Sequence, residues 1–146
     1  MQKVGVGFID DEHDQLQAML DKLRANSASM VDHATAVGLF TKLDGFIRAH
    51  FQEEENFLAK LDASGVELKR HQEAHGAILA RAEKLLGDIN LTNLEIAAQL
   101  AELLEYWMNE HIAKFDLKIP DLMVQARQNA GLPLSPTRQG RAQPLR

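Results

Sequence analysis

The sequence contains no cysteine, only four prolines and a single tryptophan among its 146 residues. The lack of cysteine excludes disulfides, thiolate metal sites, iron–sulfur clusters and cysteine nucleophiles. No apolar run approaches the roughly 20 residues that a membrane-spanning helix needs. The first residues also lack a basic segment followed by a long apolar run, as a secretory signal would have. These absences predict a cytoplasmic protein.

An excess of positive charge is missing as well. Lysine and arginine together number 16 and aspartate and glutamate 21, so the formal charge is 16 − 21 = −5. Such a chain lacks the basic footprint of a nucleic-acid-binding protein, and we expect no nucleic-acid partner. The length and the hydrophobic content of 45% suit one globular domain. We predict this domain over residues 1–130 and a flexible, disordered tail rich in Pro, Arg and Gln over 131–146.

Glycine-rich phosphate loops, nucleophile elbows and long strand-like alternation are also absent. Helical periodicity is present instead, in segments that end at turn residues. Thr92 and Glu95 have the spacing of a capping box, and Pro120 predicts a break followed by a short helix. The sequence therefore predicts an all-α protein with helices over about 11–25, 35–61, 66–86, 93–115 and 121–129.

Each of the four long predicted helices carries a stripe of apolar residues at alternating steps of three and four. Such a stripe is the face that a helix buries in a bundle. The stripe of the second helix reaches His50 by a three-residue step, so the next step of four selects Glu54. The following steps of three and four place Phe57 and Leu61 in the core. We expect Glu53 and Glu55 to face outward or to lie at a helix boundary. Six polar residues interrupt the apolar stripes: His13, His50, Glu54, His71, His75 and His111.

The short connections between these helices favour antiparallel neighbours in an up-down-up-down four-helix bundle. In that order the start of the first helix, the end of the second, the start of the third and the end of the fourth meet. The six polar residues all fall in this layer. His33, in the connection between the first two helices, is off the pattern and is expected on the surface.

This layer needs counter-charges, because burying a carboxylate and five imidazoles in an apolar core is costly unless each finds a partner. No lysine or arginine stands on the stripes nearby. A lone buried histidine is usually a satisfied core residue, but five beside a glutamate favour a metal centre. Iron, zinc, copper and manganese all accept such donors. Six converging ligands exceed one tetrahedral zinc ion, so two bridged ions fit better.

Four short motifs occur in a fixed order along the chain: His13, then His50-x3-Glu54, then His71-x3-His75, then His111-x4-Asp116. The local context includes IDDEH around the first histidine and W-x3-HI before the aspartate. Over roughly residues 4–120 this arrangement resembles the hemerythrin family. A single H-x3-H is weak evidence, whereas four motifs in order with matching separations are specific.

The resemblance also supplies the ligand roles. It implies that His71, His75 and His111 hold one iron, that His13 and His50 hold the other, and that Glu54 and Asp116 bridge both together with an oxo or hydroxo group. Asp116 enters by this resemblance, since five residues after His111 is about 140° further round an ideal helix. For Asp116 to face the core, the helix must end, loosen or form a π-bulge after Ile112.

The function implied by the resemblance is reversible dioxygen binding, for carriage, storage or local delivery, at two iron ions that change between Fe2+ and Fe3+. Ferritin-like di-iron oxidases use Glu-x-x-His pairs and more carboxylates, and the stripes here have no such pair. The expected apolar lining also offers no general acid, so we expect no enzyme activity. That lining consists of Phe51, Trp107, Met108 and Ile112. The alternatives are an oxygen or redox sensor read by an unidentified protein client, and an iron-handling, peroxide-reactive or nitric-oxide-reactive protein.

Overall fold

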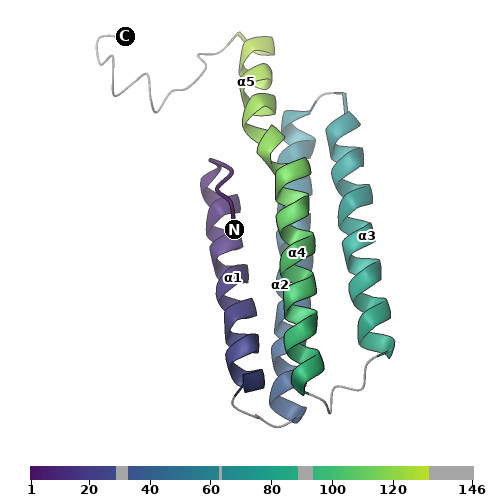
Figure 1. Ribbon diagram of the computed structural model, residues 1–146. Coiled ribbons are helices and arrows are strands. Elements are labelled where there is room, and N and C mark those ends of the chain that lie inside the picture. Colours follow the sequence, from purple (N-terminus) through teal and green to yellow (C-terminus); the bar gives the residue numbers. More distant parts are fainter. Residues whose placement is uncertain (29–32, 63, 89–93, 132–146) are drawn as a thin grey trace, which may run out of the picture.

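A computed structural model describes residues 1–28, 33–62, 64–88 and 94–131. Within these ranges every regular element is helical, which confirms the all-α class, and none of the helices combines the length and hydropathy of a membrane-spanning segment. The elements, drawn in Figure 1, are α1 (Gly7–Ala28), α2 (His33–Leu61), α3 (Val66–Asp88), α4 (Leu94–Lys114), the 3-10 turn η1 (Asp116–Lys118) and α5 (Ile119–Asn129).

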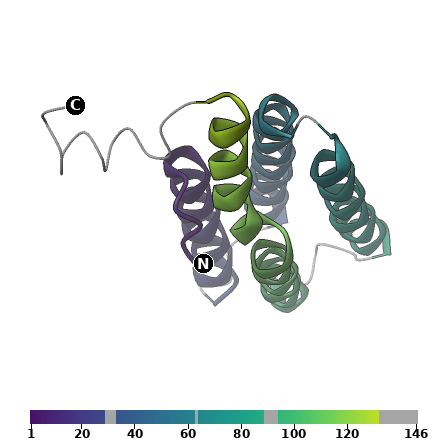
Figure 2. The same cartoon turned by 90° about the horizontal axis from the view of Figure 1, so that it is seen from above.

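The four long helices lie side by side with their long axes roughly aligned (Figure 1). Viewed from above in Figure 2, α1 and α3 occupy opposite corners, and α2 and α4 lie between them. Helix α1 contacts α2 and α4, and α3 contacts the same two helices. Helix α5 extends beyond the end of this group and contacts α2.

The first helix begins at Gly7, four residues before the predicted start. The carboxylate of Asp10 accepts hydrogen bonds from the backbone N–H groups of Val4 and Gly5, at 2.7 and 3.0 Å. Gly5 has a φ of 94°, a left-handed conformation that glycine adopts without a steric penalty. The side chain of Asp10 therefore ties the segment before the helix to its first turn.

The other helix ends lie close to their predicted positions. Helix α5 begins at Ile119 with Pro120 in its first turn, where the missing N–H of proline does no harm. The turn before α3 is organised by Asp62, which accepts hydrogen bonds from the Ser64 hydroxyl at 2.6 Å and from the Glu67 N–H at 2.7 Å. The predicted capping residue Thr92 and the tail from residue 132 onward lie outside the described residues, and the predicted domain limits stay a prediction.

Two apolar clusters lie on either side of the layer that holds the polar residues. The larger cluster contains Leu16, Leu20 and Leu23 of α1 together with buried side chains of α2, α3 and α4. The smaller one gathers Val4, Val6, Ile9, Leu58, Ile112 and Ile119. On α1, for example, His13 stands between Ile9 and Leu16. Apolar packing above and below therefore keeps water away from the polar layer.

The predicted stripe of α2 was wrong beyond Glu54. Leu58 is completely buried there, whereas Phe57 and Leu61, which the alternation of steps placed in the core, are only half-buried. A strict alternation averages 3.5 residues per step and falls behind the 3.6 residues per turn of a helix by about 20° in every seven residues. This lag accumulates along α2, and the second step of four, from Glu54 to Leu58, corrects it. Phe57 packs edge-on against Phe8 at the bundle margin, with ring centroids 5.1 Å apart.

Candidate metal centre

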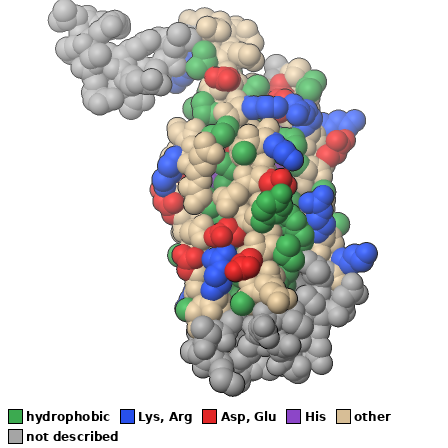
Figure 3. Space-filling model, in the orientation of Figure 1, with side chains coloured by type: hydrophobic (Ala, Val, Ile, Leu, Met, Phe, Trp, Pro, Cys, Tyr) green, Lys and Arg blue, Asp and Glu red, His purple; other side chains and the backbone are tan. Residues whose placement is uncertain are grey.

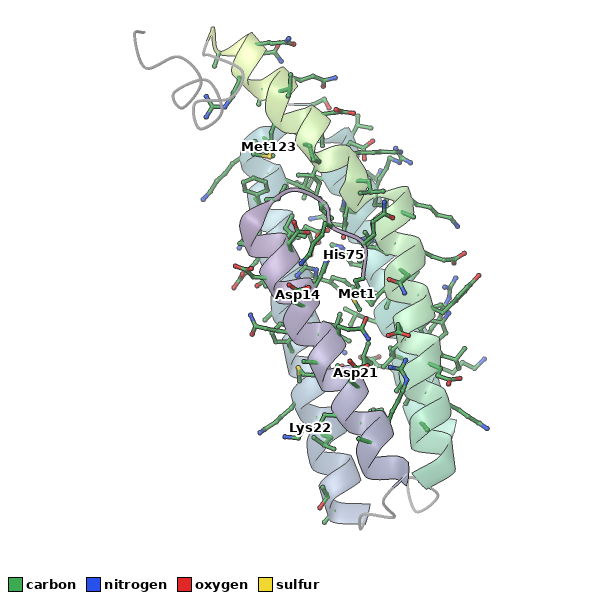
Figure 4. The ribbon with its side chains drawn as sticks, turned by 60° about the vertical axis from the view of Figure 1, so that its left-hand side comes forward. Met1, Asp14, Asp21, Lys22, His75 and Met123 are labelled. Atoms are coloured by element: carbon green, nitrogen blue, oxygen red, sulfur yellow. The ribbon has the colours of Figure 1, made fainter. Side chains whose placement is uncertain are left out.

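All seven predicted ligand residues are buried, and each side chain is at most 3% exposed. They come from every long helix and from η1, so the layer draws together segments that lie far apart in the sequence. Figure 4 shows His75 inside the bundle and not on its outer surface. As expected for the register at Glu54, the neighbouring Glu53 is exposed and Glu55 is half-buried.

The ligand atoms form two groups that share both carboxylates. In each group the atoms lie within 4.8 Å of one another. The first group is His13, His50, Glu54 and Asp116, and the second is Glu54, His71, His111 and Asp116. Six of the seven predicted residues thus fall into groups of the size that holds a metal ion.

The two carboxylates divide their oxygens between these groups. Glu54 Oε2 lies 3.6 Å from His50 Nε2, whereas Glu54 Oε1 lies 3.5 Å from His111 Nε2. Asp116 does the same, with Oδ2 at 3.4 Å from His13 Nε2 and Oδ1 at 3.0 Å from His111 Nε2. Each carboxylate therefore presents one oxygen to each group, which is the arrangement that two bridged cations require.

His75 borders the second group but does not belong to it. Its Nε2 lies 3.1 Å from Glu54 Oε1 and 3.0 Å from His111 Nε2. The ring stacks on Phe51, with centroids 3.9 Å apart and planes 6° apart. The stacking fixes the ring plane and keeps Nε2 directed at the layer.

Asp116 reaches the layer because α4 ends just before it. The last residue of α4 is Lys114, and Asp116 opens the 3-10 turn η1, in which the Lys118 N–H donates to the Phe115 carbonyl at 3.1 Å. The predicted helix end between Ile112 and Asp116 is thereby confirmed. The tighter 3-10 turn places Asp116 on the core side. A continued α-helix would have placed it on a different face.

Several of the converging atoms have no hydrogen-bond partner among the described residues. They include Glu54 Oε2, His71 Nε2 and both carboxylate oxygens of Asp116. Buried oxygens of this kind carry a large desolvation cost that only a proton or a cation removes. The donor set, imidazole nitrogens and carboxylate oxygens, is one that divalent first-row metals accept. The residues present therefore fit a pair of metal ions.

Comparison with known protein families bears on the same part of the chain. Residues 4–119 match the hemerythrin HHE cation-binding domain family. The chain belongs to the hemerythrin family. The matched range of this hemerythrin-family chain runs from the segment tied to Asp10 to the first residue of α5. No curated protein and no solved structure matches it.

Two histidines of this hemerythrin-family layer are oriented by acceptors outside it. His50 Nδ1 lies 3.0 Å from Glu12 Oε1, and His71 Nδ1 lies 3.0 Å from the carbonyl oxygen of Glu67. A hydrogen on Nδ1 leaves the lone pair of Nε2 free for a metal. The sequence analysis missed both glutamates. A signal existed, since Glu12 directly precedes His13 and Glu67 stands one helical turn before His71.

Burial and contact with carboxylates move the histidine pKa values in opposite directions. Burial lowers the pKa of His50 to about 4. Burial also acts to lower the pKa of His111, but the close carboxylates of Asp116 and Glu54 outweigh it and raise the pKa to about 9. Without metal, a proton on His111 balances part of the carboxylate charge. A bound cation takes over that role.

The pKa of Asp116 reflects the same contacts. Burial on its own raises the pKa of this carboxyl group, but the close imidazoles of His111, His13 and His71 hold it well below the usual range. Asp116 therefore stays ionised. An ionised and fully buried carboxylate is the ligand that a bridging position needs.

The expected lining is mostly apolar and buried. Phe51, Met108 and Ile112 are at most 2% exposed. Trp107 is only half-buried and packs at the margin of the larger apolar cluster. Phe115, which the sequence analysis did not single out, stacks on His111 with centroids 5.1 Å apart.

Proposed function

We propose that this protein binds dioxygen reversibly at two iron ions held by the seven buried side chains. The observation that carries the proposal is the division of Glu54 and Asp116 between two groups of histidines, with one oxygen of each carboxylate directed at each group. Membership of the hemerythrin family supports iron as the metal. When bound, the iron pair supplies the electrons and the coordination position that dioxygen needs.

The ligand assignment follows the two groups. His71 and His111, with the neighbouring His75, would hold one ion, and His13 and His50 the other. Glu54 and Asp116 would bridge them, and an oxo or hydroxo group from solvent would complete the bridge. The group of His13 and His50 has one histidine fewer than the other group with its neighbouring His75, so an ion held there would have a position for an external ligand.

The surroundings favour binding over oxidation of a substrate. Phe51, Met108 and Ile112 exclude water and carry no proton that would assist cleavage of an O–O bond. The Glu12 carboxyl lies against Nδ1 of His50, the nitrogen that faces away from the layer. We therefore propose a binding protein and not an enzyme.

The proposal includes an antiparallel, up-down-up-down order for the four long helices. Figure 1 supports it, because the start of α1, the end of α2, the start of α3 and the end of α4 lie toward one end. The contacts of the layer agree: His13 is early in α1, His71 early in α3, and His111 in the last turn of α4.

The test is to load the protein with iron, reduce it, admit oxygen and remove it again over several cycles. We expect about two irons per chain and a visible absorption band that appears with oxygen and disappears without it. A single irreversible oxidation with turnover of an added reductant would instead indicate an enzyme. Iron analysis that finds no metal would end the proposal.

Two single histidine variants provide a test of the ligand assignment and its matched control. His50→Ala removes a ligand of the ion with the external position, and we expect the reversible band to be lost. His33→Ala removes the remaining histidine, which is the first residue of α2 and precedes His50 by 17 residues, and should leave the band unchanged. Equal behaviour of the two variants would contradict the ligand assignment.

A further inference from the structure

A cleft of about 160 Å³ lies between α3 and α4 and extends to His111. Two small residues of α3, Ala74 and Ala77, leave this space open, and Trp107 and Phe115 form its apolar walls. Figure 3 shows the face that carries α4, where acidic and basic side chains surround a group of hydrophobic ones. The cleft is separate from the positions that the metal ligands enclose, because only His111 belongs to both.

The side chains that line the cleft carry a net positive charge. Arg81 lies with its guanidinium carbon 5.7 Å above the Trp107 ring, and no described carboxylate forms an ion pair with it. Lys114 lies 3.8 Å from Glu110, whose carboxylate also accepts the hydroxyl hydrogen of Tyr106. Two basic residues against one acidic residue leave 2 − 1 = +1 in the lining. A ligand with one negative charge complements it.

His111, which lines the cleft, has a buried nitrogen without a described hydrogen-bond partner. Nε2 of His111 faces the layer, 3.0 Å from Asp116, and Nδ1 has no hydrogen-bond partner in the described part of the chain. A neutral imidazole that binds metal through Nε2 carries its hydrogen on Nδ1, and this hydrogen normally has an acceptor. His50 and His71 have theirs. Nδ1 of His13 and Nδ1 of His75 also lack a hydrogen-bond partner among the described residues, but of these three histidines only His111 lines the cleft. The cleft is therefore the side from which a bound molecule would offer an acceptor to His111.

We propose that the cleft binds a small organic monocarboxylate, which accepts the Nδ1 hydrogen of His111 and packs its apolar part against Trp107. Arg81 and Lys114 provide the attraction for the negative charge. The proposal deepens the proposed function and rests on it in one respect: an acceptor at Nδ1 makes His111 a stronger donor to its metal. The bound acid would thus change the donor strength of His111 toward its metal without itself becoming a ligand of the metal.

Benzoate is a suitable probe, with benzamide as its uncharged counterpart. The iron-loaded full chain is titrated with each compound, and binding is followed by calorimetry and by the fluorescence of Trp107, the only tryptophan. We expect saturable binding of benzoate in the millimolar range or tighter, and about tenfold weaker binding of benzamide, which lacks the charge. Benzoate should also shift the visible spectrum of the centre.

Two pairs of variants on α3 locate the binding. Arg81→Gln should weaken benzoate about tenfold, whereas Lys84→Gln, an equal loss of charge outside the cleft, should not. Ala77→Leu should block the cleft and abolish binding, whereas Ala80→Leu, an exposed position of the same helix outside the cleft, should preserve it. Iron content of every variant is measured to show that the layer is intact.

The outcomes separate this inference from the proposed function. The first case is a preparation that has two irons and a reversible oxygen band. If it does not bind benzoate, or binds benzoate and benzamide equally, the proposed carboxylate site is overturned and the proposed function is not. Equal affinity in Arg81→Gln and Lys84→Gln would do the same, and so would undiminished binding in Ala77→Leu. Benzoate binding by Trp107 fluorescence without any reversible oxygen band would support the cleft and overturn the proposed function.

Discussion

His13 and Leu16 stand one turn apart on the same face of α1, and both are at most 2% exposed. Leu16 belongs to an apolar cluster, where packing depends on the volume and shape of the side chains and not on which particular carbon atoms touch. His13 Nε2 lies 3.2 Å from His50 Nε2 and 3.4 Å from Asp116 Oδ2, and these contacts require a nitrogen or an oxygen at each position. The two regions of the bundle therefore depend on different properties of their side chains.

The difference lies in what a lost side chain leaves behind. A truncated leucine leaves a cavity, whose cost depends on its volume and is confined to its neighbours. A truncated ligand in the polar layer leaves a buried charge and unpaired atoms on several other residues, and it removes a donor from both metal groups when it is Glu54 or Asp116. Substitutions in the layer should therefore alter metal content, and substitutions in the apolar cluster should alter stability alone.

The largest effect is expected for Glu54→Ala. Both metal groups lose an oxygen donor, so we predict loss of most of the bound iron and a decrease in the free energy of unfolding of roughly 3–5 kcal/mol. Iron analysis and denaturant unfolding measure the two effects. The exposed neighbour Glu53 gives the control, and Glu53→Ala should keep about two irons per chain. Iron loss in both variants would show that the register of α2 is misassigned.

A smaller effect on stability, without an effect on metal, is expected for Leu20→Ala. Leu20 is completely buried in the apolar cluster, and its truncation should lower the free energy of unfolding by about 2–4 kcal/mol. The iron content and the oxygen-dependent band should remain those of the unchanged protein. If Leu20→Ala emptied the centre, the contrast between the two regions would not hold.

The smallest effect is expected at the turn before α3. Asp62→Ala removes the acceptor of the Ser64 hydroxyl and Glu67 N–H and should cost about 1 kcal/mol at neutral pH. Asp62→Asn, which keeps an acceptor oxygen, should cost less. Thermal unfolding of the three proteins, with iron content as a check, gives the comparison.

The cost at Asp62 should also depend on pH. The hydrogen bond with Ser64 lowers the pKa of Asp62 below its ordinary value. A lowered folded-state pKa means that the stabilisation is present above the unfolded-state pKa of about 4 and is lost as the pH falls through the lower value. The difference between Asp62→Ala and the unchanged protein should therefore shrink in acid. A difference that grew in acid would contradict the assigned hydrogen bonds.

The sequence predicted the polar layer well because helical periodicity is a local property. The steps that lead to His50 select Glu54, and the structure buries Glu54 while it leaves Glu53 exposed. The same reasoning failed at Phe57, because small departures from an alternating pattern add up along a helix. The early start of α1 also escaped prediction, since it depends on the carboxylate of Asp10 folding back on two preceding residues.

Other features lie beyond sequence patterns because they depend on distances between helices. Asp116 was assigned by resemblance, and only the 3-10 turn explains how it faces the core. The division of carboxylate oxygens between two groups requires coordinates, as does the position of His75 just outside the second group. The cleft beside His111 arises from the spacing of α3 and α4, which no single stripe encodes.

The turn at Asp116 has a mechanical consequence for the C-terminal helix. Asp116, η1 and α5 follow one another without an intervening loop, and Ile119 anchors the base of α5 in the smaller apolar cluster. Asp116 stands only three residues before Ile119, so one short stretch of backbone sets both the position of the Asp116 carboxylate and the direction in which α5 leaves the bundle.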